Sequence, residues 1–275
     1  LSIFSSNVAE VEHLSFVHSD VGEINLPVNL TETSEGLWTI QVKEEAREEL
    51  RPGTYTLAID VNEGGKIFKD TLEFQWGLLA INTEKTRYVT GETANISLGA
   101  LSPNGNTLCD ASLELYVIDQ SQFIRRLPVT PSGLCNGNNV VSVPDYSAQY
   151  QIEATGTYEM YVERLAPEGN VLSHTSATFE VVESAPFSLS RGGPTRIYPL
   201  EPYTMALTLR ANQTLHGSIT ERVPADYEIL ETDARVDSTS DSKTLTWDVT
   251  LEPGESTTLS YRFDSPDISP YLYQL

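Results

Sequence analysis

The sequence predicts an all-β chain of three tandem immunoglobulin-like β-sandwich domains that form an elongated rod. Apolar and polar residues alternate along most of its 275 residues, which is the period of a strand with one buried face. Gly, Pro, Asn and Asp separate these short runs, as they do between the strands of a sandwich. A hairpin-like segment also occurs twice, at a spacing of about 100 residues, which favours tandem domains over one large fold.

The alternating runs place apolar side chains on one face of each expected strand. From Tyr55 to Val61 every second residue is apolar, and the residues between them are small or polar. The same pattern occurs at residues 96–100, 113–117, 203–209, 245–251 and 259–263. Residues 43–50, KEEAREEL, instead favour a helix, which we expect to be a short solvated turn that ends before Pro52.

The repeated segment sets the expected domain boundaries. Residues 51–77 and 154–183 both show Gly-Thr-Tyr, an alternating strand, a turn with Gly and a second alternating strand. Tyr55 and Tyr158 stand where a tyrosine corner would lie, with the ring in the core and the hydroxyl bonded to the preceding turn. A looser copy spans residues 251–263. We therefore expect domains at 1–77, 78–184 and 185–275, the first short enough to be incomplete at its start.

The amino-acid composition limits the kinds of partner that the chain can bind. The net charge is −22, from 17 basic and 39 acidic residues, so a nucleic acid backbone would be repelled. The charge is explained by solubility and low self-association, while calcium binding and a high-salt habitat stay open alternatives. No window approaches the roughly 18–20 apolar residues of a membrane span. The chain lacks an initial Met and a signal peptide, so we expect a mature segment or a fragment of a longer protein.

Two cysteines and three sequons bear on location. A disulfide between Cys109 and Cys135 would close a loop of about 25 residues, add roughly 3–4 kcal/mol and require an oxidising compartment. Two free buried thiols are the alternative. Asn29, Asn95 and Asn212 begin possible N-glycosylation sites, which suit an exported, cell-surface protein.

Catalytic patterns are missing from the sequence. The four histidines show no zinc spacing, and we interpret them as surface or boundary residues. Gly133–Gly137 reads G-x-C-x-G, but no helix follows it as a nucleophile elbow requires. Asp60–Gly64 resembles the start of a calcium loop, yet Thr71 replaces the bidentate Glu, so a hairpin turn is favoured. We predict no enzyme, no cofactor and no metal site.

Aromatic residues divide between core and surface. Trp38, Trp76 and Trp247 share strand faces with apolar neighbours, which for Trp76 are Leu72 and Phe74, so we expect core residues. The opposite strand faces hold Tyr116 and Tyr161, which we expect to be exposed. An alternation at Tyr271, Tyr273 and Leu275 indicates a terminal segment that pairs with a neighbouring domain or subunit.

Two segments resemble domains of surface proteins. Residues 80–119 contain Lys85-x-x-Tyr88-x-x-Gly91-Glu92 before a second strand, which resembles the opening of macroglobulin-like β-sandwich domains. Residues 216–270 contain Val-Pro-Ala, Thr-x-Thr-Trp and Leu-x-Pro-Gly-Glu in that order, which resembles the conserved-repeat domains of large bacterial and archaeal surface proteins. These resemblances imply tandem β-sandwiches at a cell surface and transfer no catalytic residue.

The sequence therefore predicts a structural or adhesive segment of an extracellular surface protein or filament, acting as a stalk or assembly module. Its expected partners are neighbouring domains or subunits of the same assembly, together with a glycan or protein ligand. The alternatives are a carbohydrate-binding accessory module of a larger secreted protein and a hydrolase with an unfamiliar carboxylate or cysteine site.

Overall fold

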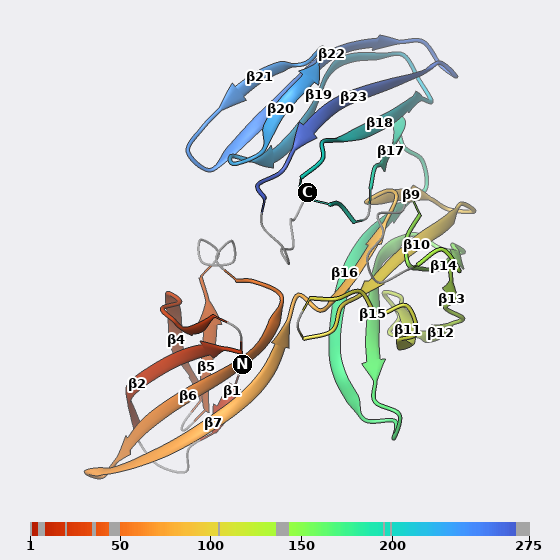
Figure 1. Cartoon of the computed structure of the whole chain (residues 1–275). Helices are drawn as coiled ribbons and strands as arrows, with labels where there is room; N and C mark the ends of the chain where they lie inside the picture. The colour runs from red at the N-terminus through yellow and green to blue at the C-terminus, as the bar shows by residue number, and fades with distance from the viewer. Residues whose placement is uncertain are drawn as a thin grey trace. The chain divides into compact units, whose positions relative to one another are not determined.

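The computed structural model describes residues 2–4, 9–19, 21–34, 37–43, 50–103, 105–135, 143–194, 196–198 and 200–267. Every regular element in these ranges is a β-strand, and the strands pair antiparallel with one exception, β9 with β16 (Figure 1). The predicted all-β fold of immunoglobulin-like sandwiches is confirmed. Contacts divide the chain into two compact units, built mainly on the residues up to Leu78 and on those from Leu79 onward.

The first unit contains two antiparallel sheets and one hydrophobic core. One sheet has the order β1-β5-β4 and the other β3-β2-β6-β7. Their strands are β1 (Ser2–Phe4), β2 (Ala9–His18), β3 (Gly22–Ile24), β4 (Val28–Ser34), β5 (Leu37–Val42), β6 (Gly53–Glu63) and β7 (Lys66–Trp76).

The second unit contains two further cores, each between two sheets. The sheets that enclose the first of them have the orders β13-β14-β10-β8 and β12-β11-β15-β16-β9. Their strands are β8 (Leu79–Thr83), β9 (Arg87–Val89), β10 (Thr93–Ala100), β11 (Ser112–Ile118), β12 (Ile124–Leu127), β13 (Thr130–Pro131), β14 (Tyr146–Gln151), β15 (Gly156–Leu165) and β16 (Val171–Val182).

The last core lies between sheets of order β17-β18-β23-β20 and β19-β22-β21. Their strands are β17 (Phe187–Gly192), β18 (Tyr203–Ala211), β19 (Leu215–Pro224), β20 (Glu228–Thr232), β21 (Arg235–Ser238), β22 (Ser242–Leu251) and β23 (Ser256–Asp264). Three cores thus lie along the chain, while the domain boundaries after residues 77 and 184 stay predictions.

The predicted alternation matches the observed burial in all three cores. Side chains of β6, β10, β18, β22 and β23 are buried at every second position. Trp247 is buried as predicted, and Trp76 is half-buried against the first core. Leu72, the apolar neighbour of Trp76 on the same strand face, is 46% exposed. It lies on the edge strand of its sheet and does not belong to the first core.

Both predicted tyrosine corners are present. The Tyr55 hydroxyl donates to the Arg51 carbonyl at 2.7 Å, and the Tyr158 hydroxyl donates to the Ala154 carbonyl at 2.9 Å. In each case the hydroxyl bonds four residues back, and the ring is buried. The repeated Gly-Thr-Tyr therefore marks two equivalent points at which a turn is tied to a core.

The glycine of each Gly-Thr-Tyr is required by a side chain packed against its backbone. A Cβ on Gly53 would clash with the His18 ring, and a Cβ on Gly156 would meet Gln120 at 2.6 Å. His18 itself is 4% exposed, and its ring centroid lies 4.8 Å from that of Tyr55. The expectation that every histidine lies at a surface or boundary is therefore wrong for His18, because the missing Gly53 side chain leaves room for the ring inside.

The turn at Gly64-Gly65 joins β6 to β7 as the predicted hairpin. Both glycines have positive φ, which suits a two-residue hairpin turn. Asn62 accepts a hydrogen bond from the Gly65 amide at 2.9 Å. Two other sequence predictions, the helical turn within residues 44–49 and the terminal alternation of Tyr271, Tyr273 and Leu275, lie outside the described residues.

Candidate functional site

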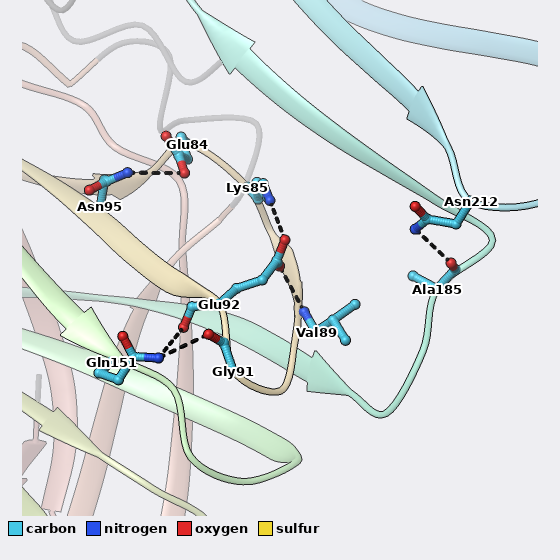
Figure 2. A network of polar contacts seen from close by, with 9 residues as sticks. All are labelled: Glu84, Lys85, Val89, Gly91, Glu92, Asn95, Gln151, Ala185 and Asn212. Carbon is cyan, nitrogen blue, oxygen red and sulfur yellow. Dashed lines mark hydrogen bonds and ion pairs between the residues drawn. The ribbon is translucent and has the colours of Figure 1, made fainter. Parts of the chain in front are cut away.

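The Lys85–Glu92 motif forms a self-contained polar lock at the start of the second core (Figure 2). The Lys85 ammonium donates to Glu92 Oε1 at 2.8 Å, and the Val89 amide donates to Glu92 Oε2 at 2.9 Å. Lys85 also lies 5.4 Å from the centroid of the Tyr88 ring, which is 1% exposed. Gly91 supplies a backbone with φ of 92° between Tyr88 and Glu92. Every residue of the motif therefore has a structural role.

The lock also shifts the titration of its members. Burial disfavours ionisation of Glu92, but hydrogen bonds from Lys85 and Val89 and the Lys85 charge outweigh it, so the pKa of Glu92 is lowered. Burial, reinforced by the charge of Glu84, raises the pKa of Tyr88 to about 12. Lys85 is thus held by a carboxylate and an aromatic ring.

The three sequon asparagines lie exposed on the described surface. Asn29 belongs to β4. Figure 2 shows that the Asn95 amide donates to Glu84 at 3.2 Å and that the Asn212 amide donates to the Ala185 carbonyl at 3.0 Å. A glycan on Asn95 or Asn212 would replace these bonds, whereas Asn29 projects from an edge strand. Modification at each of them stays a prediction.

The structure joins Cys109 and Cys135 by a disulfide that spans 26 residues of sequence. Tyr146 holds the segment around Cys109: its hydroxyl donates to the Leu108 carbonyl at 2.6 Å and accepts from the Ala111 amide at 2.8 Å. The cysteine is therefore positioned by a core side chain as well as by the bridge. Neither cysteine is available as a nucleophile in this form.

The outer face of the β11–β15–β16 sheet brings Tyr116 and Tyr161 opposite each other. Glu114 lies opposite Glu163 in the next row, and the Tyr116 hydroxyl donates to the Glu114 carboxylate. The Tyr161 ring centroid lies 5.4 Å from that of His174. Both tyrosines lie on the outer strand face as expected, and both are half-buried there. Two aromatic rings and two carboxylates thus lie side by side on one open sheet face.

The electrostatics of this face follow from those contacts. The hydrogen bond to Glu114, followed by partial desolvation and the Glu114 charge, raises the pKa of Tyr116. Desolvation and the nearby Glu163 raise the pKa of Tyr161. Arg126 donates to Glu114 at 2.6 Å and so balances one of the two opposed carboxylates. Both hydroxyls therefore stay protonated near neutral pH and act as donors.

The last core contains a polar cluster that connects its two sheets. Arg191 of β17 forms an ion pair with Glu221 of β19 at 2.7 Å, and the Tyr261 hydroxyl of β23 donates to the same carboxylate at 3.1 Å. Burial is the main reason that the pKa of Tyr261 is raised. The three groups satisfy one another, which is the behaviour of a structural cross-sheet clamp.

The motif residues of the last sandwich have structural partners too. Lys243 donates to the carbonyls of Ala225 and Tyr227, and Trp247 Nε1 donates to Asp233 at 2.7 Å. An open hollow of about 560 Å³ lies beside these groups, lined mainly by residues 226–236 of β20 and β21. Its apolar lining includes Leu230 and Val236, and Lys243 is already engaged. The hollow lies beside the edge strands β20 and β21.

Within the described ranges, no group of three or more His, Cys, Asp and Glu side chains is arranged to hold a metal ion. The histidines stand apart: His13, His174 and His216 are exposed, and His18 is buried in the first core. Across the same part of the chain, no helix is both long and apolar enough to cross a membrane. The opposed Glu114 and Glu163 were not predicted, since only the register between β11 and β15 brings them together.

The fold and the contacts of the motif residues together define the class of the protein. It is a chain of immunoglobulin-like β-sandwiches in which the motif residues bond to one another or to the backbone. The chain matches no protein-family profile and no curated protein. Among solved structures it is similar to a protein described as membrane anchored from Corynebacterium diphtheriae, at 13% identity and a TM-score of 0.26, covering 99% of this chain and 80% of that one.

Two other solved structures are similar at the same level. A DUF4785 family protein from Legionella pneumophila is 12% identical with a TM-score of 0.32, covering 96% of this chain and 72% of that one. Elastase-activated alpha-2-macroglobulin from Escherichia coli is 12% identical with a TM-score of 0.27, covering 96% of this chain and 26% of that one. At these identities and TM-scores, the likenesses carry no argument about the family or the function of this chain.

Proposed function

We propose that this chain is a structural and adhesive module of an extracellular surface protein, in which successive sandwiches act as a stalk or assembly segment. The observation that supports this proposal best is that the polar residues of the sequence motifs form hydrogen bonds and ion pairs within the fold. Polar groups are paired within the Lys85–Glu92 lock and within the Arg191–Glu221–Tyr261 cluster. In both tyrosine corners the hydroxyl is bonded to a backbone carbonyl. These ionisable and hydroxyl side chains therefore stabilise the sheets and turns of the fold.

The disulfide supports the extracellular part of the proposal. A bridge between Cys109 and Cys135 persists in an oxidising environment and is rare in a reducing cytosol. Antiparallel sandwiches also resist extension through their main-chain ladders, which suits a load-bearing segment. In this role the chain is no enzyme and needs no cofactor, and its partners are neighbouring domains or subunits of one surface assembly.

The test uses intact cells that produce the protein. Protease added outside the cells should remove the chain, and thiol alkylation before lysis should label Cys109 and Cys135 only after reduction. A matched cytosolic protein should stay intact and should be labelled without reductant. A chain that resists external protease and carries two reactive thiols would contradict the proposal.

A second candidate, carbohydrate binding, is favoured by the Tyr116–Tyr161 face. Aromatic rings can stack on the apolar face of a sugar, and the carboxylates of Glu114 and Glu163 can accept from its hydroxyls. The face lies on the outer side of a sheet, so it suits a chain of neutral sugars better than an enclosed monosaccharide. A glycan array with the native protein and with Tyr116→Ala and Tyr161→Ala should show binding that both variants lose. A native protein that binds no glycan would eliminate this candidate.

A further inference from the structure

Strand β7 is a long edge strand of the first unit, with no second strand beside it among the described residues. It has 11 residues, lies at the end of the β3-β2-β6-β7 sheet and pairs with β6 alone. Its register with β6 runs without a bulge from Lys66 to Trp76. An edge strand of this kind presents a row of N–H and C=O groups that can pair with another strand.

The surface of β7 is also unusually apolar for an exposed edge. Residues 66–73 are all exposed, and Ile67, Phe68 and Leu72 keep 51%, 45% and 46% of their accessible area. Edge strands are commonly protected by shortness, Pro, bulges or charged side chains, and of these β7 has only the charged side chains. Its two lysines and two acids cancel, so the strand is locally neutral in a chain of net charge −22. Copies that repel one another elsewhere meet least repulsion here.

We propose that β7 pairs antiparallel with β7 of a second copy of this chain, across a two-fold axis at Thr71. The two four-stranded sheets then form one continuous sheet of eight strands. The inference deepens the proposed assembly role, on which it rests, by naming the strand, the partner and the register.

The register follows from side-chain faces and charge. A two-fold axis perpendicular to the sheet keeps both cores on the same side, so each residue faces one of the same parity. With Thr71 on the axis, Lys69 faces Glu73 of the second copy, and this pair occurs twice. Phe68 faces Phe74 in the same way, which gives an aromatic cross-strand pair on the core side.

Most shifted registers bring unfavourable neighbours together. An axis at Phe68 would pair Lys66 with Asp70 twice, but it would overlap only residues 66–70 of the strand. An axis at Lys69 or at Asp70 sets that residue against its own copy, and like charges directly opposite destabilise a sheet. An axis at Leu72 places Lys69 opposite Gln75 and forms no ion pair. Lys69 already bonds Asp60 of its own sheet at 2.7 Å, but its side chain is 76% exposed, so a second carboxylate can still approach its ammonium group.

Other sheet edges suit this pairing less well. Six of these edge strands have four residues or fewer, namely β1, β3, β9, β12, β13 and β21. Strands β8 and β17 have five and six residues, and β4 and β20 contain register shifts. Edge strand β19 has 10 residues but ends in Pro224 and contains Gly217. Pro and Gly both weaken a strand's capacity to add a neighbour. Strand β7 therefore combines length, regular register and apolar surface.

Sedimentation velocity of the full chain over a range of concentrations tests the proposal. The native protein should show a reversible monomer–dimer equilibrium. Lys69→Glu and Glu73→Lys should each weaken self-association at least tenfold, because each sets like charges opposite one another twice. An equimolar mixture of the two variants should restore association, since the opposed charges are then of opposite sign. Glu168→Lys, at an exposed turn, changes the net charge as Glu73→Lys does and should leave association unchanged.

Cross-linking measures the register independently of charge. Thr71→Cys should oxidise to a covalent dimer, because the two positions face each other across the axis, whereas Ile67→Cys should not. No described cysteine is free to compete with the new thiol. A native chain that stays monomeric, or variants whose mixture fails to associate, would overturn the inference. Dimers that persist in every variant would also overturn it, while leaving the surface role to the cell-based test. Circular dichroism checks that each variant is folded.

Discussion

Removal of the Cys109–Cys135 bridge should destabilise the sandwich that contains it without changing its fold. The bridge spans 26 residues, for which the chain-entropy relation gives about 12 cal/mol/K, or roughly 3.5 kcal/mol at 25 °C. The native position of Cys109 is also fixed by Tyr146 through Leu108 and Ala111. We therefore expect the loss to arise mainly in the unfolded chain.

The perturbation is the double variant Cys109→Ser with Cys135→Ser, compared with the native protein in urea and in differential scanning calorimetry. At about 4–8 °C for each kcal/mol in a domain of this size, its transition should fall by roughly 15 °C or more. The transition of the first unit serves as an internal control and should not move. Tyr146→Phe should destabilise the bridged and unbridged chains equally. A loss below about 1 kcal/mol, or strong coupling to Tyr146, would refute the reasoning.

Three further predictions concern the tyrosine corners and the Lys85–Glu92 motif. Tyr55→Phe and Tyr158→Phe should each cost about 1 kcal/mol, seen in calorimetry as a lower transition temperature for the sandwich concerned, because a buried hydrogen bond to a carbonyl is lost. The pKa of Glu92 is lowered on folding, so its contribution to the free energy of unfolding is present above the unfolded pKa near 4.3 and is lost as the pH falls through the folded pKa. Glu92→Gln should therefore flatten the pH dependence of the free energy of unfolding, measured in urea, below about pH 4.5. Gly91→Ala should cost about 1–2 kcal/mol of unfolding free energy by chemical denaturation, because φ is 92° although the space beside it is open.

The fold was largely predictable because its signal is local. Alternation between Tyr55 and Val61 requires only that one face be buried, and the structure buries or half-buries it. The tyrosine corners were predictable for a similar reason, since each hydroxyl bonds a carbonyl four residues earlier. Such contacts join residues that are close in the sequence, so a short motif is enough to predict them.

What the sequence did not show depends on residues far apart in the chain. His18 is buried because Gly53 leaves room for its ring 35 positions later. Leu72 is exposed on an edge strand outside the first core, which alternation within β7 cannot reveal. The facing Glu114 and Glu163 need the register of β11 with β15. The candidate sites were therefore less predictable than the strands that position them.

The net charge of −22 gives assembly through β7 a distinctive dependence on salt. At low ionic strength repulsion between two acidic copies acts over their whole surfaces, while the Lys69–Glu73 pairs act only at contact. The Debye length falls from about 30 Å at 0.01 M to about 8 Å at 0.15 M, which screens the long-range repulsion first. The apolar contact of Phe68 with Phe74 does not depend on charge. Association should therefore strengthen between these two salt concentrations, whereas an edge joined by ion pairs alone would weaken throughout.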